Sequence, residues 1–272
     1  MTHSRIDRRF AALKTRNRAA FIPFIMAGDP DLATTADILK RLPESGADLI
    51  EIGMPFSDPM ADGPVIEAAG LRALKNDISL DNIFSLVSNF RKTDAETPII
   101  LMGYYNPVYC YGIEKFCNNA KKAGVDGMIL VDLPPEEEDE FVPATHAAGL
   151  ALVKLITPTS TEERLDKILK TARGFVYYVA VSGITGDKSA QYEQVNIALQ
   201  KIRTKTDLPI AVGFGIKTPE DVATVGSFAD AAVVGSALVR EMANSDTPVD
   251  TAADMVRSLS SALTSAPAKN NV

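Results

Sequence analysis

Short apolar runs, each with two β-branched residues, alternate with amphipathic stretches along this chain. The runs predict eight strands, at 21–26, 48–53, 98–103, 126–131, 151–156, 175–180, 209–214 and 230–235. Segments between them, such as 32–47 and 161–172, space their apolar residues three and four apart, which is the helical period. Eight strands alternating with helices in 272 residues predict a single α/β domain over 1–272, a closed parallel (β/α)₈ or TIM barrel with an N-terminal helix.

An open doubly wound sheet is the alternative architecture. It is disfavoured because no GxGxxG motif follows the first predicted strand. The final residues, approximately 265–272, are small and polar, so we expect a frayed tail.

The connection between the second and third strands is longer than one loop and one helix require. It contains MPFSDPMADGP at 54–64 and then a helical pattern at 65–76. Long insertions in compact domains usually carry function, and loops that follow strands lie on the active-site face of a barrel. The pattern therefore predicts a functional insertion after strand 2.

Glu51 interrupts the apolar second strand. Alternation puts Glu51 on the same face as Leu49 and Gly53, so we expect its side chain inside the barrel near the mouth. Burial of a lone carboxylate raises its pKa, which suits a general acid and base at neutral pH. The alternative is a structural ion pair with Lys154, if that side chain faces inward from the fifth strand.

Asp62 follows in a loop stiffened by Pro55, Pro59 and Pro64. An aspartate in such a loop is often only a cap or an Asx-turn acceptor. Two carboxylates beside one barrel mouth also suit a division of roles, in which one moves a proton and the other stabilises a positive charge.

Three glycine-containing segments, 182–189, 213–221 and 235–239, follow the last three strands. Thr218 and Pro219 predict one helix start, and Ser236 predicts another. Free backbone N–H groups at a helix start bind phosphate without a basic side chain, and barrels commonly bind phosphate after strands 7 and 8. The alternative is that these glycines serve only tight turns.

The composition narrows the classes of function. A formal net charge of −7 argues against a nucleic-acid or anionic-membrane surface. The chain shows neither an apolar run of membrane-spanning length nor the apolar stretch of a signal peptide, so we expect a cytoplasmic protein. Cys110 and Cys117 form no disulfide framework or metal-type cluster, and His3 and His146 are not placed for a Ser-His-Asp triad.

The segment EIGMPFSDPMADGP at 51–64 resembles the signature of the tryptophan synthase α subunit family. Further matches occur in the family's order, at 21–30, 98–108, 124–137, 183–186, 213–216 and 235–239. The resemblance implies cleavage of indole-3-glycerol phosphate to indole and glyceraldehyde 3-phosphate. It implies no metal and no organic cofactor in this chain.

The resemblance also assigns roles to residues. It makes Glu51 the general acid and base, lets Asp62 meet the indole N–H, and lets Thr185 close a lid against Asp62. The expected substrate-binding residues are Phe24, Tyr104, Ile129 and Phe214, with Tyr177 nearby, and the expected phosphate donors are Gly186, Gly215, Gly235 and Ser236. Ala180 departs from the family pattern, which often has serine before the lid.

The partner that the resemblance implies is a β subunit that carries pyridoxal phosphate, in an α2β2 heterotetramer. The expected contacts are Asp58, Pro59, 105–109 and Pro134. Alternatives are another phosphate-binding barrel, such as a sugar-phosphate isomerase or indole-glycerol-phosphate synthase, an inactive allosteric partner, and a stand-alone lyase that releases indole. The presence of both Glu51 and Asp62 argues against the inactive partner.

Overall fold

The strands form one parallel sheet that closes on itself. The computed structural model describes residues 4–180, 188–213 and 215–264. Its strands, in the order β5-β4-β3-β2-β1-β9-β8-β7-β6, are β1 (Ala20–Met26), β2 (Ile50–Gly53), β3 (Ile99–Gly103), β4 (Gly127–Leu130), β5 (Ala151–Leu152), β6 (Lys154–Ile156), β7 (Val176–Val179), β8 (Ile210–Gly213) and β9 (Ala231–Val234). Only Val153 separates β5 from β6, so the two ends of the sheet belong to one interrupted strand. The predicted TIM barrel is confirmed, and each of the eight predicted strand segments contains a strand.

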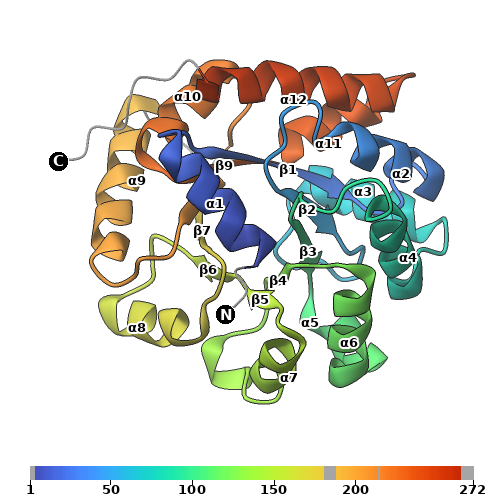
Figure 1. The fold of residues 1–272 in the computed structure, drawn as a ribbon, viewed down its shortest axis with the longest axis horizontal. Coiled ribbons are helices and arrows are strands. Elements are labelled where there is room, and N and C mark those ends of the chain that lie inside the picture. The colour runs from blue at the N-terminus through green and yellow to red at the C-terminus, as the bar shows by residue number, and fades with distance from the viewer. Residues whose placement is uncertain (1–3, 181–187, 214, 265–272) are drawn as a thin grey trace.

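Helices surround this ring, and the N-terminal helix lies across one of its ends (Figure 1). They are α1 (Arg5–Thr15), α2 (Leu32–Arg41), α3 (Pro64–Leu74), α4 (Leu80–Phe90), α5 (Tyr105–Tyr111), α6 (Ile113–Ala123), α7 (Phe141–Ala148), α8 (Glu162–Thr171), α9 (Lys188–Arg203), α10 (Pro219–Phe228), α11 (Ser236–Ala243) and α12 (Pro248–Thr264), with a short 3₁₀ helix, η1 (Pro135–Glu137). Many of them begin at sequence signals. Ser4 caps α1 through a reciprocal pair of hydrogen bonds with Asp7, for example.

Alternation along the strands divides the buried residues into two clusters. Outward-facing residues such as Ile50 and Ile52 pack under the helices. Inward-facing residues such as Leu49 and Ile100 fill the barrel. This inner cluster also contains Ile6 from α1, so the N-terminal helix completes the barrel core.

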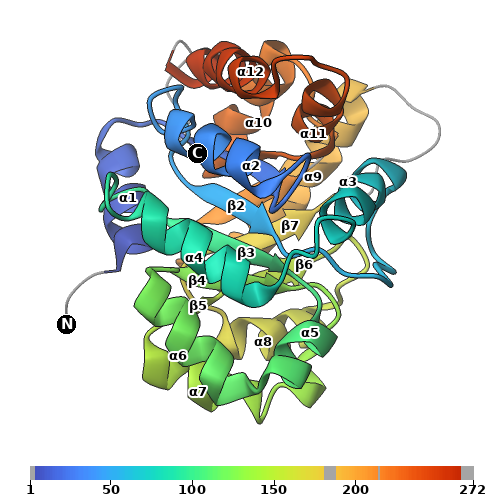
Figure 2. The same cartoon turned by 90° about the vertical axis from the view of Figure 1, so that its right-hand side faces the viewer.

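Helix α1 closes the end of the barrel at which the strands begin. Phe10 packs against Phe175 with ring centroids 5.8 Å apart. Arg5 pairs with Asp126, the residue before β4, at 2.9 Å. Figure 2 shows α1 at one end of the barrel and α3 and α5 at the other, which leaves the second end for the loops that follow the strands.

The insertion after β2 adds α3, as the sequence predicted, and a partly buried ion pair holds this helix to the loop after β1. The Arg72 guanidinium donates to both oxygens of Asp29, at 2.7 and 2.8 Å. The Asn76 side chain donates to the carbonyl of Pro30 at 2.6 Å. Because α3 begins directly after Asp62 and Gly63, this attachment also restrains the loop that carries Asp62.

Candidate active site

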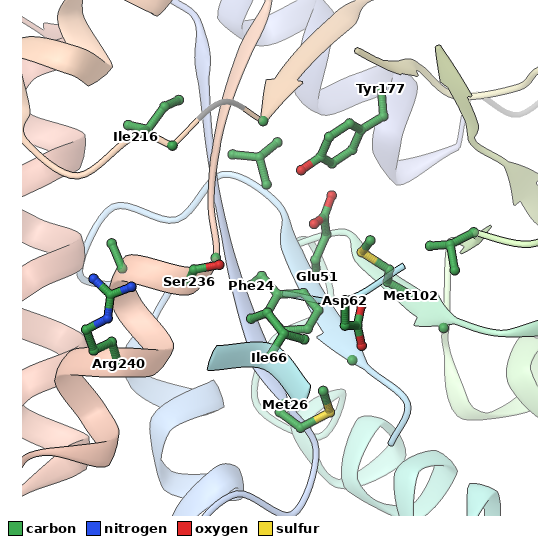
Figure 3. A pocket seen from close by; sticks show the side chains of 18 of the residues that line it. Phe24, Met26, Glu51, Asp62, Ile66, Met102, Tyr177, Ile216, Ser236 and Arg240 are labelled. Carbon is green, nitrogen blue, oxygen red and sulfur yellow. The ribbon is translucent and has the colours of Figure 1, made fainter. Parts of the chain in front are cut away.

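A cavity of about 250 Å³ opens where the strands end. Its walls come from the ends of β1, β2, β3, β7, β8 and β9 and from the start of α11 (Figure 3). Both carboxylates singled out in the sequence, Glu51 and Asp62, line it. The loop face of the barrel therefore holds a site large enough for a small organic molecule.

Glu51 lies inside the barrel, as alternation predicted. Its side chain is only 1% exposed, and neither carboxylate oxygen has a hydrogen-bond partner among the described residues. Burial raises its pKa to about 8, so the side chain carries a proton at neutral pH. The ring of Tyr177 lies beside the Glu51 carboxyl group in Figure 3. The site thus holds a buried carboxylic acid that forms no hydrogen bond with any described residue.

The structural alternative for Glu51, an ion pair with Lys154, is wrong. Lys154 pairs instead with Glu138, and both side chains are buried. Thr171 donates to the second oxygen of Glu138 at 2.6 Å. Val153 and Leu155 belong to the inner cluster, so strand alternation turns Lys154 outward under the helices.

Asp62 reaches the cavity from the insertion loop and interacts with Tyr104. Burial raises the pKa of this half-buried carboxyl, and a hydrogen bond with Tyr104 opposes the shift. The Tyr104 hydroxyl also accepts a hydrogen bond from the backbone of Ala61 at 3.0 Å, and the Tyr104 ring lies 5.3 Å from that of Phe56. Tyr104, expected only as a wall residue, therefore also fastens the loop that carries Asp62.

The other end of the cavity is formed by Gly215, Gly235 and Ser236. Gly235 precedes α11, and no side chain caps this helix start. Helix α10, in contrast, is capped by a reciprocal pair of hydrogen bonds between Thr218 and Asp221. Of these two helix starts, that of α11 has first-turn N–H groups without a side-chain cap.

The remaining expected site residues divide into three groups. Phe24 and Tyr177 line the cavity. Ile129 is fully buried in the inner cluster and is not among the described lining residues, whereas Val131, two positions along the same face, does line it. Thr185, Gly186 and Phe214 lie outside the described residues, as does the tail 265–272.

The lining also includes residues that the sequence reading missed. Met102 follows the inward-facing Ile100 by two positions, so strand alternation could have identified it. Arg240 lies four residues after Ser236 on α11, which is the spacing of neighbours on one helix face.

The described residues contain no group of three or more His, Cys, Asp or Glu side chains able to hold a metal ion. Within the same part of the chain, no helix is both long and apolar enough to cross a membrane. Cys110 and Cys117 are free thiols. His146 accepts a hydrogen bond from Arg173 at 2.7 Å and is not part of the cavity wall as described.

The sequence of this chain is similar to those of one known protein family. Residues 10–266 match the model of the family described as tryptophan synthase alpha chain. Proteins with that name from Caulobacter sp. (strain K31) and Caulobacter vibrioides are each 56% identical over 242 residues, which is 89% of this chain and 88% of theirs.

Solved structures of proteins from the same family are also similar to this chain. A crystal structure of the tryptophan synthase alpha chain from Legionella pneumophila subsp. pneumophila is 42% identical, with a TM-score of 0.87, and the match covers 96% of this chain and 98% of that one. Tryptophan synthase from M. tuberculosis, in an open form with BRD0059 bound, is 30% identical, with a TM-score of 0.87 and coverage of 97% and 100%.

Proposed function

This chain belongs to the family of tryptophan synthase alpha chains, lyases that cleave indole-3-glycerol phosphate, and we propose that Glu51 and Asp62 carry out the chemistry of this reaction. The observation that supports the assignment is the buried, protonated Glu51 carboxyl in a cavity that it shares with Asp62. The products are indole and glyceraldehyde 3-phosphate, and the reaction is a retro-aldol cleavage.

The reaction needs two proton transfers and a place for positive charge. Glu51 gives its proton to C3 of the indole, which turns the ring into an indolenine cation. Asp62 accepts a hydrogen bond from the ring N–H and stabilises that cation. Glu51, now a carboxylate, takes the proton of the hydroxyl on the carbon bonded to C3. The O–H electrons become the aldehyde C=O as the C–C bond breaks, and the bond's electrons return to the ring as indole.

We assign the substrate's phosphate to the end of the cavity opposite the two carboxylates. Gly235 and Ser236 at the uncapped start of α11 support this assignment, and Gly215 lies on the same cavity wall. We propose Gly186 as a further phosphate donor. Phe24, Tyr104 and Tyr177 are proposed as walls for the organic part of the substrate. Thr185 and Phe214 are proposed as the remaining contacts that the family resemblance implies, with the buried Ile129 supporting the cavity from behind its lining.

We further propose that the chain works in the cytoplasm with a tryptophan synthase beta chain that carries pyridoxal phosphate, in an α2β2 assembly, and that it holds no cofactor of its own. The family name implies a beta-chain partner. Tyr109, which is 59% exposed, lies within the expected contact segment 105–109, and Met60, which is 81% exposed, directly follows the expected contact Pro59. Two large apolar side chains exposed near the site are consistent with an interface.

The test is release of indole from indole-3-glycerol phosphate by the purified chain, with and without the beta chain. We expect Glu51→Gln to fold normally by circular dichroism and to lose most of the turnover, because an amide cannot exchange the proton. Near-normal turnover in the variant would refute the role of Glu51. Equal wild-type rates with and without the beta chain would favour a stand-alone lyase.

A further inference from the structure

The acidic and basic side chains of the cavity wall are separated. Among the described lining residues, Glu51 and Asp62 carry carboxyl groups, and Lys217 and Arg240 are the cations. Figure 3 shows Glu51 and Asp62 on one side of the cavity, and Ser236 and Arg240 on the opposite side. Lys217 follows Gly215 and so belongs to the same end as the glycines. In a chain of net charge −7, the proposed phosphate end thus has two cations in its wall.

Arg240 has no competing partner in the described structure. Its guanidinium makes no ion pair or side-chain hydrogen bond with any described residue. Other arginines do pair, such as Arg72 with Asp29 and Arg203 with Asp230. Arg240 is exposed and still forms part of the cavity wall. A guanidinium with free donors at a cavity edge is suited to a carboxylate or a phosphate from solution.

The position of Arg240 on α11 directs it toward the helix start. It lies one turn after Ser236, and helical side chains lean toward the N-terminus of their helix. The first turn of α11 has backbone donors without a side-chain cap. An anion bound there would have N–H groups beneath it and a guanidinium at the solvent side.

We propose that Arg240 is a substrate-binding residue that holds the phosphate from the solvent side of the cavity. This inference rests on the proposed phosphate site. Arg240 lies across the cavity from Glu51, so it acts on capture of the substrate and not on proton transfer. Because the guanidinium is exposed, its contribution is modest and is screened by salt.

The experiment compares Arg240→Gln and Arg240→Lys with the wild-type chain. The matched control is Arg257→Gln, which removes the same charge from an exposed arginine of α12 that pairs with Asp254. Steady-state indole release gives kcat and KM separately, and calorimetry gives the affinity for glycerol 3-phosphate. Both are measured at low salt and at about 0.5 M salt, where screening is strong.

At low salt we expect Arg240→Gln to raise KM about fivefold and to weaken glycerol 3-phosphate binding by a similar factor, with kcat unchanged. We expect Arg240→Lys to retain most of the wild-type affinity and Arg257→Gln to behave as wild type. At high salt, the difference in KM and in affinity between Arg240→Gln and wild type should become smaller. An unchanged KM with unchanged glycerol 3-phosphate affinity, or a fall in kcat alone, would overturn the inference.

Failure of the proposed function gives a different result. A wild-type chain that releases no indole would count against the reaction, and the binding measurement would still test Arg240. Weaker glycerol 3-phosphate binding in Arg240→Gln alone would then support the anion contact. Equal binding in Arg240→Gln and Arg257→Gln would refute it.

Discussion

Glu51 lies in surroundings that stabilise its neutral form. Its two oxygens have no hydrogen-bond partner among the described residues, and its pKa is raised to about 8. An ionised carboxylate at this position is unfavourable to the folded state, whereas in the unfolded chain the same group is solvated. The folded protein thus gives up stability at high pH to keep a proton donor inside the barrel.

The pH dependence of the free energy of unfolding tests whether ionised Glu51 destabilises the folded state. The unfolded chain releases the Glu51 proton near the ordinary value of 4.5, and the folded chain releases it near 8. Between these values the folded state binds more protons, so this group lowers the free energy of unfolding as pH rises, and its effect levels off above about 8. We expect Glu51→Gln to gain stability relative to wild type across that window, on the order of a few kcal/mol in total.

Urea unfolding of both proteins at several pH values measures the difference. The slope with pH is the informative quantity, because the buried amide has its own constant cost. A difference that does not change with pH would contradict the raised pKa.

Residues whose placement follows from strand period were accessible from the sequence. Alternation put Glu51 inside the barrel, and the same rule applied to Val153 and Leu155 would have turned Lys154 outward. The pairing of Lys154 with Glu138 and the contact of Tyr104 with the Asp62 loop join segments that are distant in sequence. Such contacts have no local signal, and a single sequence does not specify them.

At the scale of elements, the closed end of the barrel has room for α1 because Gly127, Ala151 and Gly174 there carry a methyl group or no side chain. Gly127 begins β4, and a Cβ added to it would lie 2.8 Å from the carbonyl oxygen of Ala151 and 3.0 Å from the Ala151 Cβ. A Cβ on Gly174 would lie 3.0 Å from the same Ala151 Cβ and 3.2 Å from Ile6 of α1. The strands and the helix therefore fit only with glycine and alanine at these positions.

We expect Gly127→Ala to destabilise the fold by about 1–3 kcal/mol, because backbone atoms must move to make room. The matched control is Gly70→Ala in the middle of α3. There an added Cβ would make only an ordinary contact, 3.8 Å from the end of Met26. The control should gain about 0.5–1 kcal/mol from its better helix propensity. Chemical denaturation measures both, and equal effects would rule out the packing explanation.

The order of strands and helices followed from the hydrophobic pattern, because each element has its own period and its own boundary residues. The extra helix of the insertion was also visible as a helical pattern at 65–76, close to the observed α3. The packing of α1 into the barrel end was not accessible. Its apolar stripe of Ile6, Phe10 and Leu13 is visible, but the surface that it covers is assembled from strands far along the chain.

On the scale of the whole molecule, the loop face of the barrel carries large apolar side chains that are exposed to solvent. Met60 lies in the insertion loop and Tyr109 on α5, and both are more than half exposed. The cavity opens on this same end of the barrel. A partner that covers this face would therefore lie next to the substrate site.

We expect Tyr109→Asp to weaken association with a tryptophan synthase beta chain about tenfold or more, since a charge replaces a large apolar contact. Indole release by the isolated chain should remain. Ile197→Asp is the control, because Ile197 is 52% exposed on α9, across the barrel from α5 (Figure 1). Titration by calorimetry measures the affinities. Equal weakening by the two substitutions would place the interface elsewhere.

The pairing of β1 with β9 also governs how the chain is completed during its synthesis. Ala20 lies opposite Ala231, and Pro23 opposite Val234, so the first strand receives its second neighbour from near the other end of the chain. A ribosome producing this protein releases β1 early, and that strand keeps one unpaired edge until β9 has emerged. The unpaired N–H and C=O groups of an open strand edge can pair with a strand of another chain. Closure of the ring therefore also removes a site at which the new protein could aggregate. A message cut short within α10 would yield a chain that never loses that edge.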